Sequence, residues 1–274
     1  SKYVEKFQIN KKLEENDDQL RQCNEILIRD EKKCNKLNEK GSPKKFSINE
    51  CKEKHPDPSC QDFQKCKCKL AEYMSGHEPL YDPDHWSKPI IEGSHNCYTY
   101  FLNNHIPEVM NECNKMCKKK GSCHKKINSC GNLKPQPGDY AAEVGITNGK
   151  NRKYTCDEMV KKVISDNTHK KTKKKYIHKV AFTRKCPPNY YKGVVVVDPN
   201  STYHFYRQDN NVRYSHKQGT LRVENVDASG KPIYIPHLAD MNYNKEKRKN
   251  GINYTNVCDY MCVPNNEFIK THAI

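Results

Sequence analysis

Apolar residues recur at every seventh position in the first forty residues of the chain. This stretch is highly charged and free of proline and glycine, and the residues that share the spacing are Leu13, Leu20, Leu27 and Cys34. Such a spacing places them on one face of a helix, and the Gly-Ser-Pro sequence at 41–43 ends that helix. A stripe this narrow does not stabilise an isolated helix. We therefore predict a charged helical arm over residues 1–43 that packs on a partner or on the rest of its own chain.

Prolines and cysteines are interspersed through residues 44–90, where the cysteines are Cys51, Cys60, Cys66 and Cys68. This composition predicts a loop-rich connector that is stapled by disulfides. A zinc site is the rival interpretation, but the common zinc sites use paired C-x-x-C sequences, which this segment lacks.

Residues 91–274 combine helical and strand patterns. An apolar-periodic stretch at 96–102 predicts a helix that begins at or near Cys97, and residues 156–164 predict another helix. Segments rich in β-branched and aromatic residues then predict consecutive antiparallel strands, at 180–182, 193–197, 203–207 and 212–214. Helices followed by such a meander indicate an α+β domain over residues 91–274.

Further cysteines fall in an insertion at residues 113–130, which contains His124 and the cysteines Cys113, Cys117, Cys123 and Cys130. A disulfide-bonded insertion and a zinc-clipped one fit this pattern equally well. Near the C-terminus, Cys258 and Cys262 have the i, i+4 spacing of a helix, but two disulfides that anchor the tail are a better explanation than a shared metal. We assign no metal ligand and no cofactor from the sequence.

The composition predicts a thin core. Only 34% of the 274 residues are apolar and the mean hydropathy is −1.06, so other interactions must hold the fold. Fifteen cysteines can supply cross-links, which indicates an oxidising setting such as a virion or the extracellular space. A reduced chain whose thiols bind zinc or fill the core is the alternative. Because fifteen is odd, complete pairing leaves one thiol free.

Most of the net charge of +16 lies after residue 90. A basic domain favours anionic partners such as nucleic acid, anionic glycans, a membrane surface or acidic proteins. The lysine-rich run at 170–175, in a predicted basic loop at 165–178, is most simply a solvated surface. No apolar stretch approaches the 18 or so residues of a membrane span. Because the chain starts with Ser1 and shows no signal-peptide pattern, we expect a processed N-terminus.

Cys97 and His204 have the positions of a nucleophile and its general base. A helix N-terminus lowers the pKa of a thiol and can hold an oxyanion, and we take Asn96 as the candidate oxyanion donor. His216 follows His204 by twelve residues and falls on the paired strand. The two imidazoles are expected to face each other as base and orienter and to titrate near neutral pH.

These residues resemble the papain-like superfamily, and especially its bacterial cell-wall endopeptidases and CHAP amidases. The resemblance covers about residues 93–240 and rests on Asn96-Cys97 at a helix start, Pro137-Gly138-Asp139 before the sheet, and histidines on adjacent strands. It implies a papain-like core, in which a nucleophile helix packs on an antiparallel sheet, with Cys97 as nucleophile, His204 as general base and His216 as orienter. Residues 203–219 and 227–231 are also similar to uncharacterised cysteine-rich proteins of bacteria and of large DNA viruses of algae and amoebae.

Two functions follow as expectations. The first is a papain-like cysteine hydrolase, a peptidase or amidase that acts on a peptide or a wall polymer and is associated with a virion. The alternative is a non-catalytic structural protein of a large virus particle, a minor capsid or cement protein that contacts other structural proteins through its helical arm and basic surface. Nonspecific nucleic-acid binding is a third option that rests on charge alone.

Overall fold

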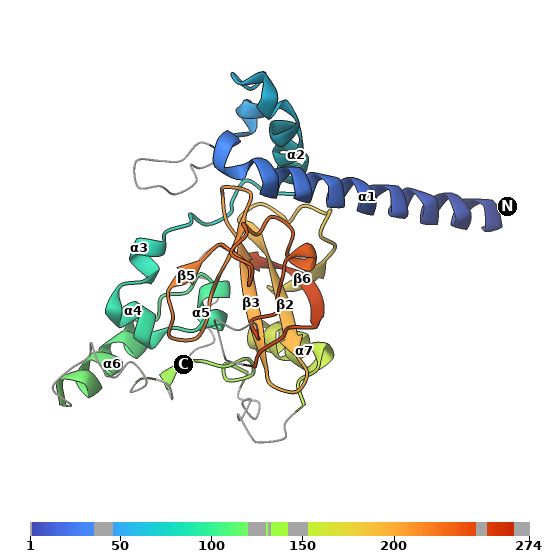
Figure 1. The fold of residues 1–274 in the computed structure, drawn as a ribbon. Helices are drawn as coiled ribbons and strands as arrows, with labels where there is room; N and C mark the ends of the chain where they lie inside the picture. Colours follow the sequence, from blue (N-terminus) through green and yellow to red (C-terminus); the bar gives the residue numbers. More distant parts are fainter. Residues whose placement is uncertain are drawn as a thin grey trace. The chain divides into compact units, whose positions relative to one another are not determined.

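The chain divides into two compact units, Ser1–Glu72 and Tyr73–Ile274. The structure is a computed structural model that describes residues 2–35, 46–119, 130, 133–141, 153–244 and 251–265, without the side chains of 2–15, 118 and 119. The division after Glu72 joins the helical arm and most of the cysteine-rich connector in one unit. Figure 1 shows the elements of each unit.

The first unit begins with the long helix α1 (Lys2–Cys34). Its buried face contains Leu20, Leu27 and Cys34, as the seven-residue spacing predicted, together with Asn24 and Glu31. The helix ends at Cys34, before the Gly-Ser-Pro sequence at 41–43 that was predicted to end it. The side chain of Leu13 lies outside the described residues. The arm is therefore a helix whose narrow apolar face is covered.

The remainder of this unit is more helical than the predicted connector. It contains the short 3-10 helices η1 (Ile48–Cys51) and η2 (Pro58–Cys60) and the helix α2 (Gln61–Ala71). Three disulfides hold these elements together, and they are Cys23–Cys66, Cys34–Cys60 and Cys51–Cys68. The first two cross-link α1 to α2 and to η2. Residues of the same unit therefore pack on the narrow apolar stripe of α1.

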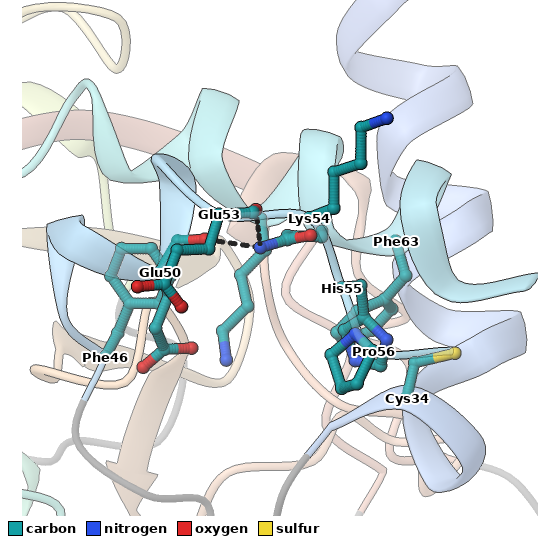
Figure 2. Close-up of a pocket in the computed structure, with 10 residues that line it drawn as sticks. Cys34, Phe46, Glu50, Glu53, Lys54, His55, Pro56 and Phe63 are labelled. Atoms are coloured by element: carbon teal, nitrogen blue, oxygen red, sulfur yellow. Dashed lines mark hydrogen bonds between the residues drawn. The ribbon is translucent and has the colours of Figure 1, made fainter. Parts of the chain in front are cut away.

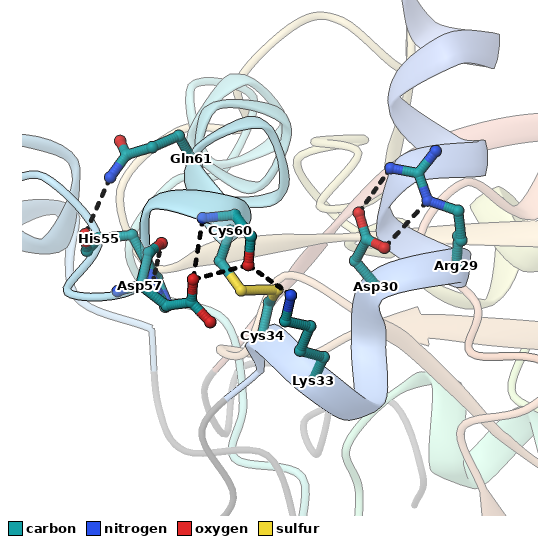
Figure 3. Close-up of a disulfide and its surroundings, with 9 residues drawn as sticks. Arg29, Asp30, Lys33, Cys34, His55, Asp57, Cys60 and Gln61 are labelled. Carbon is teal, nitrogen blue, oxygen red and sulfur yellow. Dashed lines mark hydrogen bonds and ion pairs between the residues drawn. A yellow bond between two sulfur atoms is a disulfide. The ribbon is translucent and has the colours of Figure 1, made fainter.

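The surroundings of the Cys34–Cys60 disulfide show how this junction is fixed (Figure 3). Asp57 caps η2 and accepts hydrogen bonds from the backbone N–H and the hydroxyl of Ser59 at 2.9 and 2.6 Å. Lys33, next to Cys34, donates to the same hydroxyl. Polar contacts therefore reinforce the covalent link between the end of α1 and η2.

The second unit is built on a six-stranded antiparallel sheet in the order β1-β6-β2-β3-β4-β5. The strands are β1 (His178–Val180), β2 (Tyr190–Asp198), β3 (Thr202–Gln208), β4 (Tyr214–Lys217), β5 (Val223–Glu224) and β6 (Asn256–Pro264). The meander from β2 to β4 agrees with the predicted consecutive strands, and β5 extends it by a strand that was not predicted. The unit is α+β and disulfide-rich, as expected.

Strand β6 was not predicted. It lies between β1 and β2 and pairs with both, so this late segment joins β1 to the rest of the sheet. The helical i, i+4 spacing of Cys258 and Cys262 is misleading here, because both cysteines lie on this strand. They form the disulfides Cys156–Cys258 and Cys186–Cys262, which confirms that two disulfides anchor the tail.

Two other strands differ from their predicted positions by a few residues. The segment predicted at 212–214 is mostly turn: Val212 has a φ of 75° and the N–H of Asp209 donates to the carbonyl of Arg213 at 2.9 Å. The strand itself starts at Tyr214 and includes His216. Similarly, β1 ends at Val180, where the predicted strand at 180–182 began.

Helices and a loop segment cover the two faces of this sheet. The helices of the second unit are α3 (Pro83–Trp86), α4 (Pro89–Ser94), α5 (Cys97–Phe101), α6 (Pro107–Lys119) and α7 (Cys156–Asp166), with a 3-10 helix η4 (Pro236–Leu238). Residues of α5 and α7 share one core cluster with Val195 and Phe205 of the sheet. On the opposite face, Tyr206 of β3 contacts Tyr243, and His204 stacks on Tyr254, both from the segment before β6. No helix formed by the described residues is long and apolar enough to cross a membrane.

Gly193 allows α5 to approach β2 closely. A Cβ atom at this position would lie 2.3 Å from Cε2 of Phe101 and 3.2 Å from the carbonyl oxygen of Tyr206, and the Phe101 ring is fully buried.

We predict that Gly193→Ala lowers the free energy of unfolding by about 2 kcal/mol, as overpacking does, when measured by urea denaturation. The double variant Gly193→Ala/Phe101→Leu should lose less than the sum of the single variants, and a neutral Gly193→Ala would contradict the close packing.

Candidate functional site

Cys97 is the first residue of helix α5, as predicted. Asn96 caps this helix: its side-chain oxygen accepts hydrogen bonds from the N–H groups of Tyr98 and Thr99 at 3.1 and 3.0 Å. The amide nitrogen of Asn96 donates to the carbonyl of Pro135 at 2.8 Å. Capping thus occupies most of the hydrogen-bonding capacity of Asn96, and the second amide hydrogen is what remains for an oxyanion.

Among the described cysteines, Cys97 alone has a free thiol. Cys97 is only 8% exposed, and it belongs to the core cluster between α5, α7 and the sheet. Burial raises the pKa of this thiol to about 12, although the ammonium of Lys217 and the N–H groups at the helix start act in the opposite direction. The expected lowering of the pKa by the helix N-terminus is therefore outweighed by desolvation, and Cys97 is a neutral thiol near pH 7.

The structure brings His204 and His216 together, as the hairpin predicted. Nε2 of His204 lies 2.9 Å from Nδ1 of His216, and Nε2 of His216 lies 3.0 Å from the carbonyl oxygen of Val226. A carbonyl oxygen only accepts, so a neutral His216 carries its proton on Nε2 and accepts at Nδ1. His204 consequently donates from Nε2, which leaves its Nδ1 as the basic nitrogen. This is the tautomer that a general base held by an orienter requires.

The protonation of His204 differs from the expectation. Both imidazoles are buried, and burial together with the neighbouring His216 lowers the pKa of His204 well below its usual value. The expected titration near neutral pH is therefore wrong for His204, because the interior disfavours the charged imidazolium. At neutral pH this histidine is uncharged.

His204 lies on β3, and its neighbour Phe205 packs on α5, the helix that begins with Cys97. Phe205 packs against Tyr98 and Phe101 of α5, with ring centroids 5.3 and 4.8 Å apart. Successive residues of a strand point to opposite faces, so His204 projects from the other face, where it stacks on Tyr254 with centroids 5.5 Å apart. Among the described residues, no hydrogen bond joins Cys97 to His204 or His216. The structure unites the two histidines, and Tyr254, which stacks on His204, is near enough to Cys97 for the thiol to contribute to the raised pKa of the Tyr254 hydroxyl.

Lysines near Cys97 are features that the sequence did not reveal. Lys217 is fully buried and donates to the carbonyl oxygens of Glu92, His95 and Gly219 at 2.9, 3.0 and 2.6 Å. Burial lowers its pKa to about 7, and that of Lys134 to about 8. Lys217 directly follows His216 in the sequence, but a buried lysine has no signature that separates it from the many surface lysines.

Arg207 and Asp209 form a second buried polar group between β3, β4 and α5. The guanidinium donates to Asp209, Asn103 and Tyr100 at 3.0, 2.8 and 2.9 Å, and it lies 4.0 Å from the centroid of the Tyr100 ring. Ser215 donates to the same carboxylate. Every group of this network is partnered, so it serves to fix the helix on the sheet rather than to react.

The first unit contains a separate pocket of about 140 Å³ next to the Cys34–Cys60 disulfide (Figure 2). Phe46 and Phe63 form its apolar walls, and Glu50, Glu53, Lys54 and His55 also line it. Lys67 donates to Asn35 at 2.9 Å and lies 5.1 Å from the Phe46 ring centroid. The lining has no arrangement of nucleophile and base.

The cysteine cluster of the predicted insertion contains disulfides. Cys113 is bonded to Cys130, and Cys117 is also disulfide-bonded. The three sulfur atoms lie within 4.8 Å of one another, which is a spacing that a metal could use only after reduction. Cys123 and His124 lie outside the described residues. For the described cysteines, the disulfide alternative is the one found.

Comparisons with known proteins give a partial match. The chain is similar to the "Insoluble matrix shell protein 1" of Ruditapes philippinarum, with 52% identity over 46 residues. The match covers 17% of this chain and 31% of the length of that protein. No protein-family model matches the chain, and no solved structure matches it.

The raised pKa of Cys97 predicts a characteristic pH profile for its reactivity. In the native, oxidised chain, the rate of reaction with 4,4′-dithiodipyridine should keep rising up to at least pH 9, because only the scarce thiolate reacts. The Cys97→Ser variant is the control, and it should show no reaction. A fast reaction that is already constant between pH 5 and 8 would contradict the neutral buried thiol, since a thiolate–imidazolium pair gives that profile.

Proposed function

We propose that this chain is a non-catalytic structural protein of an extracellular matrix. The observation that carries the proposal is the state of the cysteines: every described cysteine except Cys97 is in a disulfide, and Cys97 is buried as a neutral thiol. This state fits a chain that must keep its shape in an oxidising setting, where disulfides persist.

The polar groups of the second unit support the same proposal. The most prominent histidines, His204 and His216, are fully or almost fully buried and hydrogen-bonded to each other. Arg207 and Lys217 are fully buried and donate to groups on other elements. Partnered groups of this kind rigidify a fold, whereas a substrate needs side chains that it can reach.

The similarity to a matrix shell protein gives the proposal its setting. The matched segment is short, and it covers 17% of the chain. We therefore take from it the class of assembly, an insoluble matrix, in preference to a virus particle. The basic surface is the part of the chain that is suited to bind acidic components of such a matrix.

A thiol hydrolase of the papain-like kind is the second candidate. Two features favour it. The residue with the free thiol, Cys97, is the first residue of a capped helix, and His204 has the tautomer of a general base that is oriented by His216. Activity would require the thiol of Cys97 and the imidazole of His204 to come within hydrogen-bond distance. The two candidates thus differ in whether Cys97 is used at all.

The test has two parts. The oxidised chain is incubated with peptide and peptidoglycan substrates beside the Cys97→Ser variant, after thermal melts have shown that both are folded. We expect wild type to release no more product than the variant. We also expect wild type and variant alike to be retained in the insoluble matrix of cells that secrete them, because Cys97 has no part in assembly.

Two results would overturn the proposal. Product release by wild type that disappears in Cys97→Ser would show that the thiol is catalytic. Recovery of the chain only from the soluble secreted fraction would show that it is no component of the matrix.

A further inference from the structure

A lysine-rich hairpin connects helix α7 to strand β1. Residues 168–175 have the sequence THKKTKKK, in which all five lysines are exposed. The ends of the hairpin pair through Thr168 and Lys175, and the N–H of His169 donates to the carbonyl of Lys174 at 2.8 Å. Lys173 adopts the left-handed conformation, with a φ of 58°. Backbone hydrogen bonds therefore hold five like charges on a defined turn, an arrangement that anions stabilise.

A polar pocket of about 160 Å³ lies at the base of this hairpin. Two of the five lysines line it, Lys170 and Lys173, whereas Lys171 and Lys175 do not. The other lining groups include Ser165, Thr168, His169 and Tyr140. The hairpin thus presents two kinds of exposed lysine, those that line the pocket and those that do not.

Tyr140 gives this pocket an unused hydrogen-bond donor. Its hydroxyl is buried and has no hydrogen-bond partner among the described residues. Burial and the nearby Asp166 raise the pKa of Tyr140, so the hydroxyl keeps its proton. A buried donor without an acceptor is costly, and a bound oxyanion would supply the acceptor.

Among the described lining residues, Asp166 is the one carboxylate, and its charge is already compensated. Asp166 accepts hydrogen bonds from the hydroxyl of Tyr98 and from the N–H groups of Gly138 and Ala141, at 2.7, 2.8 and 2.9 Å. Its lone pairs are directed to these donors, and Lys170 and Lys173 line the same pocket. The pocket as a whole favours an anion over a cation.

We propose that the hairpin and its pocket bind a sulfated polysaccharide, with one sulfate ester seated among Lys170, Lys173 and Tyr140 and neighbouring sulfates on the remaining lysines. This inference rests on the proposed function and names the matrix component that the chain holds. Lysine is a compact point charge that binds sulfate and phosphate alike, and we name sulfate because the proposed function places the chain in an extracellular matrix. Nucleic acid is less suitable, because neither nearby tyrosine offers a free ring face for a base: Tyr140 is partly buried against the core, and Tyr176 has the ammonium of Lys174 at 5.4 Å from its ring centroid.

The test compares polymers that differ only in sulfation and variants that differ only in position. Chondroitin sulfate and unsulfated chondroitin are immobilised, and the full oxidised chain is passed over both at physiological salt. We expect wild type to bind the sulfated polymer at least 10-fold more tightly. Lys170→Gln/Lys173→Gln should lose at least 10-fold in affinity for it, and Tyr140→Phe about 3-fold. The matched control Lys171→Gln/Lys175→Gln removes the same charge and should lose less than 3-fold.

Two outcomes would overturn this inference. Equal losses in the two double variants would mean that only the overall charge matters and that the pocket binds nothing. Equal affinity for the two polymers, or tighter binding to a phosphoprotein or to duplex DNA, would exclude sulfate as the ligand. None of these outcomes bears on the catalytic state of Cys97, so the proposed function is tested separately.

Discussion

The fold of the second unit depends on two disulfides that hold β6 between β1 and β2 in the sheet. Cys156–Cys258 and Cys186–Cys262 link β6 to residues 102 and 76 positions earlier, and loops of this length correspond to about 4–5 kcal/mol each in the chain-entropy model. Without β6, strand β2 would have an unpaired edge beside its fully buried valines. For a chain with only 34% apolar residues, covalent links replace part of the missing hydrophobic stabilisation.

The same constraint explains why so many charged and polar side chains lie inside this unit. The sheet that these disulfides stabilise carries the buried residues Lys192, Arg207 and Lys217. Each donates to carbonyl oxygens or side chains of other segments. Burial lowers the pKa of Lys192 and Lys217 to about 7, which reflects how strongly the interior disfavours their charge. Arg207 and Lys217 thereby tie the sheet to α5 and to the segment before it.

The sequence predicted the elements that have a clear period and failed where tertiary contacts decide. The seven-residue spacing of Leu20, Leu27 and Cys34 identified α1, and Cys97 marked the start of α5. Strand β6 was not predicted because its two cysteines have a helical spacing. The start of β4 was predicted two residues too early, because Val212 takes a turn conformation that β-branched residues rarely adopt. The pairing of fifteen cysteines cannot be deduced from spacing. That Cys97 is the free one, and that desolvation governs its pKa, depends on packing that no local pattern records.

The pairing of the cysteines is therefore the most direct test of the account. Proteolysis of the native chain under acidic, non-reducing conditions, followed by mass spectrometry, identifies the linked peptides. The account predicts the pairs Cys156–Cys258 and Cys186–Cys262, with Cys97 recovered as a thiol. A disulfide to Cys97, or reduced cysteines at 258 and 262, would contradict it.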